Sequence, residues 1–84
     1  MRVTVRLFAR LREIVGASEL SREVSPGAAV SALWGDLVRQ WPDLSAYEHA
    51  ISSAVNAEYA RMDRELREGD EVAFLPPVSG GGQG

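Results

Sequence analysis

The glycine-rich C-terminal end is the part of this 84-residue sequence in which residue type and spacing permit chemistry. Pro76 and Pro77 favour a stiff, extended segment. The residues that follow them are Val78, Ser79, Gly80, Gly81 and Gly82. Because glycine has no side chain, such an arm fits a channel too narrow for other residues, and its four residues from Val78 to Gly81 reach about 13–14 Å when extended. A terminal carboxylate there is open to activation by another enzyme; a frayed end without function is the alternative.

The rest of the chain lacks the residue sets that catalysis or metal binding requires. It contains no cysteine, so disulfides, thiolate metal sites and a cysteine nucleophile are excluded. Its single histidine, His49, falls in a predicted loop and reads as a surface or packing residue. No glycine-rich phosphate-binding motif is present. We therefore expect no metal, no bound cofactor and no active site of the chain's own.

Composition indicates one folded domain. Hydrophobic residues make up 45% of the chain, charged residues 25%, and the formal net charge is −3, which argues against intrinsic disorder and against nucleic-acid binding. Arginines at positions 2, 6, 10 and 12 read as a solvated strand face and helix, with a docking surface for an acidic partner as the alternative. No segment has the roughly 18 apolar residues of a membrane span or the apolar run of a secretory signal, so we expect a cytoplasmic protein without membrane contact.

Five segments alternate apolar and polar residues or are rich in β-branched residues, which predicts β-strands. They are Arg2–Phe8, Ser18–Val24, Ile51–Asn56, Glu58–Met62 and Glu71–Leu75. Phe8 in the first strand and Leu75 in the last are apolar residues expected on the outward face. Pro76 and Pro77 end the last strand, because proline cannot donate to a sheet.

Two helices are expected between these strands. A short one follows the first strand, with Leu11, Ile14 and Val15 at helical spacing and Gly16 closing it. The main helix covers about residues 27–40 and carries the widest apolar stripe. That stripe consists of Val30, Leu33, Trp34, Leu37, Val38 and Trp41. Core packing is preferred over a ligand cage for the two tryptophans, and residues 43–50 read as a loop.

The order of elements predicts an α+β domain with a mixed sheet curled over one main helix, plus a short helix after the first strand. The last strand joins the first most economically if the two lie side by side in the middle of the sheet. The expected domain spans residues 1–77, and residues 78–84 form a flexible glycine-rich arm.

Three stretches resemble the small subunit of molybdopterin synthase, a sulfur carrier with a ubiquitin-like β-grasp fold. They are Phe8–Glu13 with Gly16, Leu66 with Gly69–Val72, and Phe74–Gly81. The resemblance extends from Arg2 to Gly81. It implies that Phe8, Tyr59 and Leu75 stand near the positions that this family uses to dock its partners.

The resemblance also implies the chemistry. An adenylating enzyme related to ubiquitin-activating enzymes would use ATP to convert the last glycine to an acyl-adenylate, and a persulfide sulfur would then yield a thiocarboxylate. The arm would enter the large synthase subunit and donate sulfur to cyclic pyranopterin monophosphate in molybdenum cofactor biosynthesis. The chain would thus be the sulfur-donating subunit of a complex.

The end of the chain departs from the family pattern. The family stops at the pair corresponding to Gly80 and Gly81, whereas this chain continues with Gly82, Gln83 and Gly84. We expect a processing protease to trim the chain after Gly81. Activation of Gly84 on a longer arm, or an inactive copy, are the other interpretations.

Other functions share the same features. The chain could carry sulfur for thiamine, cysteine or tRNA thiolation, or be a ubiquitin-like modifier whose activated end is joined to lysines. An interaction domain with an inert tail is the third alternative.

Overall fold

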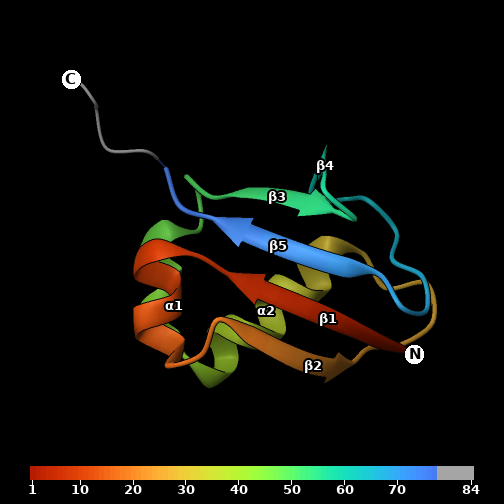
Figure 1. Cartoon of the computed structure of the whole chain (residues 1–84), viewed down its shortest axis with the longest axis horizontal. Helices are drawn as coiled ribbons and strands as arrows, with labels where there is room; N and C mark the ends of the chain where they lie inside the picture. The colour runs from red at the N-terminus through yellow and green to blue at the C-terminus, as the bar shows by residue number, and fades with distance from the viewer. Residues whose placement is uncertain (78–84) are drawn as a thin grey trace.

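A five-stranded mixed sheet forms the body of the computed structural model, in which residues 1–77 are described. Helix α2 packs across one face of the sheet, and helix α1 lies beside the end where β5 finishes (Figure 1). The elements are β1 (Arg2–Leu7), α1 (Ala9–Val15), β2 (Glu19–Glu23), α2 (Val30–Gln40), the 3-10 helix η1 (Pro42–Tyr47), β3 (Ser52–Val55), β4 (Glu58–Ala60) and β5 (Glu71–Leu75).

The strand order is β2-β1-β5-β3-β4, with β1 and β5 parallel at the centre and the other pairs antiparallel. This confirms the predicted α+β class and the central pairing of the first and last strands. The register places Leu7 beside Phe74, so β1 and β5 end at the same edge of the sheet. The root of the C-terminal arm therefore lies next to the start of α1.

Alternation along the central strands builds the core. Val5, Leu7, Val72 and Phe74 are fully buried on the face that α2 covers. The Trp34 ring of α2 packs against Phe74 with 5.0 Å between ring centroids. Burial of aromatic and aliphatic side chains in this way supplies most of the stability of a small domain.

The Trp34 side chain confirms the core-packing interpretation, because it is only 4% exposed. Trp41 is half-buried, and the Arg22 guanidinium lies 5.4 Å from its ring centroid. Trp34 thus packs inside the core, and Trp41 packs at its margin beside Arg22.

Some predicted boundaries were wrong. Helix α2 begins at Val30 rather than near residue 27, because Gly27 has φ 85° and Ala29 is extended. The predicted loop 43–50 contains the 3-10 helix η1, whose Leu44 is fully buried. The six residues Pro42–Tyr47 are too few for their apolar members to show a helical period, so the sequence alone did not predict this 3-10 helix.

Within residues 1–77, none of the helices is both long and apolar enough to cross a bilayer.

A buried carboxylate connects the turn before β5 to the β3–β4 turn. Asp70 is 9% exposed, and its Oδ2 accepts a 2.8 Å hydrogen bond from the Arg67 backbone N–H. Its Oδ1 accepts a 2.9 Å bond from Asn56 Nδ2, while Asn56 Oδ1 accepts one from the Glu71 N–H. The Thr4 N–H also donates to the Asp70 backbone carbonyl at 2.9 Å. This network fixes where β5 begins against β1 and β3.

We predict that Asp70→Ala lowers the free energy of unfolding by about 1–3 kcal/mol, because it leaves the Arg67 N–H and the Asn56 amide without acceptors. Urea denaturation followed by circular dichroism measures the change. Asp63→Ala, which removes an exposed carboxylate, is the control and should alter stability by less than about 0.5 kcal/mol. Equal effects of the two substitutions would contradict a role for the Asp70 network.

The β3–β4 turn offers a prediction of opposite sign. Asn56 and Ala57 adopt φ values of 52° and 72°, a left-handed pair that favours Asn followed by Gly. Ala57→Gly should therefore raise the free energy of unfolding by about 1 kcal/mol, because it removes the strain on Cβ. The control is Ala54→Gly in β3, which should be destabilising. Thermal denaturation compares both with the parent chain.

Candidate functional site

The predicted arm residues lie outside the residues that the structure describes. These are Val78, Ser79, Gly80, Gly81 and Gly82. The last described residues, Pro76 and Pro77, follow β5 directly. The site that can be built from the structure is therefore the surface around the root of the arm.

Phe8 and Leu75 lie side by side at this root. Leu7 pairs with Phe74 in the parallel register, so the residues that follow them, Phe8 and Leu75, lie at the same edge of the sheet. Leu75 is half-buried opposite Ser52 of β3, and Phe8 is 38% exposed. Each follows a buried residue of its strand, Leu7 or Phe74, so both occupy the sheet face opposite α2. The structure thus brings two of the three predicted docking residues together.

Tyr59 occupies the same face but lies farther from the arm. It pairs with Ala54 of β3, which in turn pairs with Ala73 of β5, so two strand spacings separate β4 from β5. At about 4.8 Å per strand, its backbone is about 10 Å from that of β5. Its side chain is 82% exposed. The small side chains of Ala54 and Ala73 leave a shallow floor between Tyr59 and the arm root.

Arg6 completes this surface. The sequence singled it out only as one of four N-terminal arginines, with docking of an acidic partner as the alternative interpretation. It pairs with Ala73, and its Cζ lies 5.9 Å from the Phe8 ring centroid, within range of a cation–π contact. Its Nη1 lies 3.5 Å from Glu71 Oε2. Its position two residues before Phe8 in a strand was the available signal, since i and i+2 share a face.

We name this surface the arm-root patch. Its residues are Arg6, Phe8, Ala54, Tyr59, Ala73 and Leu75. Apolar and aromatic atoms dominate it, and its one positive charge is balanced by the neighbouring Glu71. The patch can therefore anchor a partner through apolar burial, with Arg6 as a polar contact.

Helix α1 holds Phe8 in place. Phe8 is its extended N-cap residue, with φ −125° and ψ 153°, and the fully buried Leu11 attaches the helix to the core. The helix ends as predicted at Gly16, whose φ is 84° and whose N–H donates to Arg12 O at 2.8 Å. Glycine is favoured at this position because it adopts the left-handed conformation without steric strain. The short helix thus fixes one wall of the arm-root patch.

Two further arginines of the N-terminal segment are paired with glutamates. Arg2 lies 2.9 Å from Glu23, and Arg10 lies 3.0 Å from Glu13. The hydrogen bond to Glu13 raises the pKa of Arg10, so this guanidinium stays charged throughout the physiological range. These pairings support the interpretation of the N-terminal arginines as a solvated strand face and helix.

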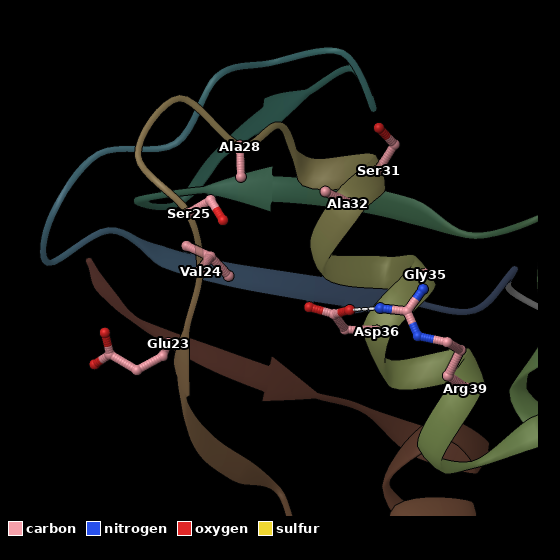
Figure 2. A pocket seen from close by; sticks show the side chains of 9 residues that line it. All are labelled: Glu23, Val24, Ser25, Ala28, Ser31, Ala32, Gly35, Asp36 and Arg39. Carbon is pink, nitrogen blue, oxygen red and sulfur yellow. Dashed lines mark hydrogen bonds and ion pairs between the residues drawn. The ribbon is translucent and has the colours of Figure 1, made fainter.

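Groups for acid–base or metal chemistry do not gather in the described residues. His49 is exposed, and residues 1–77 contain no cluster of three or more potential metal ligands among His, Cys, Asp and Glu. A groove between the end of β2 and α2 is lined mainly by small side chains, with an Asp36–Arg39 ion pair at its rim (Figure 2). It lies at the edge of the sheet where Glu23 pairs with Arg2, opposite the arm root.

Gly35 belongs to the same groove. A Cβ built there would meet no atom within 4 Å, so steric crowding does not explain this helical glycine. The missing side chain at this position therefore adds open space to the groove.

Comparisons with known proteins agree with this geometry. The sequence profile of the ThiS family matches residues 5–81. The molybdopterin synthase sulfur carrier subunit of Chlamydomonas reinhardtii is 39% identical over 83 residues, which cover 96% of this chain and 100% of that protein.

Solved structures share the fold. The crystal structure of SAMP1 from Haloferax volcanii superposes with a TM-score of 0.85 at 31% identity, and covers 96% of this chain and 100% of that one. In the crystal structure of the Amycolatopsis orientalis BexX/CysO complex, one chain matches with a TM-score of 0.70 at 29% identity, over 94% of this chain and 99% of that one. The predicted ubiquitin-like β-grasp fold is therefore confirmed. From the match over nearly all of its length, this chain belongs to the ThiS family.

Proposed function

We propose that this chain is the sulfur-carrier subunit of a molybdopterin synthase. The observation that carries the proposal is the exposed arm-root patch beside the point where β5 leads into the Pro-Pro-Val-Ser-Gly-Gly sequence. The near full-length match to a carrier subunit of this enzyme supports it. In this function the C-terminal glycine carries sulfur as a thiocarboxylate and donates it to cyclic pyranopterin monophosphate.

The division of labour follows from the groups present. The described residues offer a docking surface but no acid–base pair near the arm root, so activation and transfer fall to partners. An adenylating enzyme of the ubiquitin-activating class would join the terminal carboxylate to AMP and release pyrophosphate. A persulfide sulfur would then attack the acyl carbon, and AMP would leave. A thiol of the sulfur-donating partner would reduce the S–S bond of the resulting acyl disulfide, which releases the thiocarboxylate and forms a disulfide on that partner. The chain binds no cofactor in this scheme, and ATP is used by the partner.

The arm-root patch serves as the anchor for both partners. Phe8 and Leu75 flank the arm where it leaves the sheet, so a partner that buries them also receives the arm in a defined direction. Large apolar side chains at the centre of an interface contribute most of its affinity. The large synthase subunit and the adenylating enzyme would accordingly bind in turn, since they use the same surface.

Gly81 is the residue proposed to carry the thiocarboxylate. The three residues after it would be removed by a protease, because an internal glycine has no free carboxylate to activate. The ThiS profile match ends at residue 81, which supports this position.

A second function is favoured by one comparison. The structural match to SAMP1 and the 34% identity to the small archaeal modifier protein 1 of Haloferax volcanii concern a protein named as a modifier. A modifier would use the same activated carboxylate with a lysine amine as acceptor instead of sulfur. Denaturing immunoblots of native cells distinguish the two, since only a modifier gives higher-mass adducts.

A carrier for another thiolation pathway is the remaining candidate. The same fold occurs in one chain of the BexX/CysO complex, which is not named as a molybdopterin synthase, and this match supports the alternative. Co-purification separates these cases: a synthase large subunit supports the main proposal, and a thiazole synthase or sulfhydrylase supports the other.

We predict that Phe8→Ala combined with Leu75→Ala weakens binding to the large synthase subunit at least about tenfold, because the interface loses its two apolar anchors. Isothermal titration calorimetry measures the dissociation constant. Val38→Ala on α2 is the matched control, since it also shortens a partly buried apolar residue but on the opposite face. Unchanged affinity in the folded double variant would rule out docking through the patch.

A second prediction concerns the C-terminus. Protein purified from its native cells should lack the last three residues, and a fraction should be heavier by the difference between one sulfur and one oxygen atom. Intact-mass spectrometry measures both. Chains that end uniformly at Gly84 and never contain sulfur there would contradict trimming and thiocarboxylate formation.

A further inference from the structure

Apart from the single imidazole of His49, every basic side chain of this sequence is a guanidinium. Its nine Lys and Arg residues are all arginine, and it has no cysteine. Arginine stays protonated at all pH values that proteins meet, so its side chain does not act as an acyl acceptor. Lysine amines and cysteine thiolates are the side chains that attack activated acyl groups most readily. The sequence contains no lysine, and the amine that the structure describes is the α-amino group of Met1.

An activated C-terminus can undergo a side reaction, in which it acylates a nucleophile of the carrier itself. An amine nitrogen attacks the acyl carbon of a C-terminal acyl-adenylate or thioester and forms an amide bond. AMP or the thiol leaves with the electron pair of the broken bond, and the proton of the amine passes to solvent. When the amine belongs to another copy of the carrier, the product is a covalent dimer, and repeated attack gives longer chains of copies. A carrier rich in lysine would lose activated molecules to these products.

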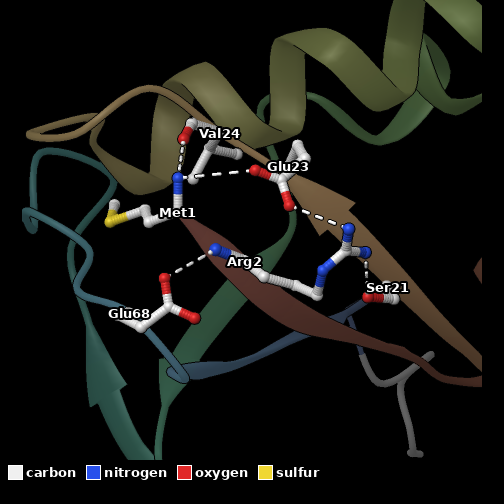
Figure 3. A network of polar contacts seen from close by, with 6 residues as sticks. All are labelled: Met1, Arg2, Ser21, Glu23, Val24 and Glu68. Carbon is white, nitrogen blue, oxygen red and sulfur yellow. Dashed lines mark hydrogen bonds and ion pairs between the residues drawn. The ribbon is translucent and has the colours of Figure 1, made fainter.

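The Met1 amino group is held within the sheet (Figure 3). It donates a 2.8 Å hydrogen bond to Val24 O, and the Val24 N–H donates back to Met1 O at 2.8 Å. The Glu23 carboxylate lies 3.6 Å from the amine and also contacts Arg2 at 2.9 Å. The Met1 side chain is only 11% exposed. Attack through this nitrogen would require these contacts to break.

The same amine is far from the root of the arm. Because β1 and β5 run parallel, Met1 lies at the edge where β5 begins, whereas Leu75 lies at the edge where it ends (Figure 1). The strand from Met1 to Leu7 spans about 20 Å. An arm that reached its own α-amine would have to fold back along the whole sheet.

We infer that the chain is built as an acyl donor that is closed to acylation by its own activated end. Guanidinium side chains keep the charges that pair with Glu13, Glu23 and Glu71 while offering no nucleophile. The activated group therefore passes only to a partner's acceptor, whether that acceptor is sulfur or an amine. With either acceptor, each transfer involves a single carrier molecule, and carrier molecules do not become joined to one another. The inference rests on the proposed activation of the C-terminus.

The test installs one amine on the full-length chain. Arg61 is exposed and forms no ion pair within residues 1–77, so Arg61→Lys keeps the charge and disturbs no contact of its side chain. The parent chain, Arg61→Lys and the matched control Arg61→Gln are each prepared with a C-terminal thioester by intein cleavage. They are incubated at equal concentration at pH 8. Denaturing gels and intact-mass spectrometry then measure the amounts of hydrolysed, cyclic and dimeric product.

The expected result is at least about tenfold more covalent dimer from Arg61→Lys than from the parent chain or Arg61→Gln. The parent and the control should yield hydrolysed monomer, with no cyclic product one water lighter. Equal dimer yields in all three, whether high or undetectable, would overturn the inference, as would cyclisation of the parent through Met1.

Because the thioester is made chemically, this outcome does not depend on an activating enzyme. Failure of the proposed function would appear separately, as native protein without a sulfur-bearing C-terminus.

Discussion

The parallel pairing of β1 with β5 is the constraint on which the rest of the structure depends. It joins the two ends of the described chain at the centre of the sheet, where both strands have neighbours on each side. It buries Leu7 and Phe74 against α2 and leaves Leu75 beside Phe8 on the other face. The Asp70 network sets the start of β5 against β1. The position of the arm root is therefore a consequence of core packing.

This arrangement separates stability from function along a single strand. In β5 the inward residues Val72 and Phe74 belong to the core, whereas Ala73 and Leu75 belong to the arm-root patch. The alternation of a β-strand lets one short segment do both, because successive side chains point to opposite faces. The core thus fixes the patch beside the end of β5, where the proposed docking of a partner would take place.

The distribution of charge and nucleophiles serves the same purpose. Arginine provides the ion pairs with Glu23, Glu71 and Glu13 that a lysine would also provide, but it adds no acceptor for an activated acyl group. The α-amine of Met1 is engaged at the opposite edge of the sheet from the arm. In the described residues, the arginine side chains and the engaged Met1 amine thus offer little reactivity towards an activated acyl group.

The sequence alone determined the alternating strands, the Gly16 helix end, the order of elements and the family, because short-range periodicity and the C-terminal motif encode them. The start of α2, the η1 helix around Leu44 and the contact of Arg6 with Phe8 required tertiary structure. The position of β3 between β4 and β5, which separates Tyr59 from Leu75 by two strand spacings, also required tertiary structure. Burial of Leu44 in the core decides the η1 helix, and pairing between strands decides where Tyr59 lies. No local pattern of side chains records which segments of the chain become neighbours.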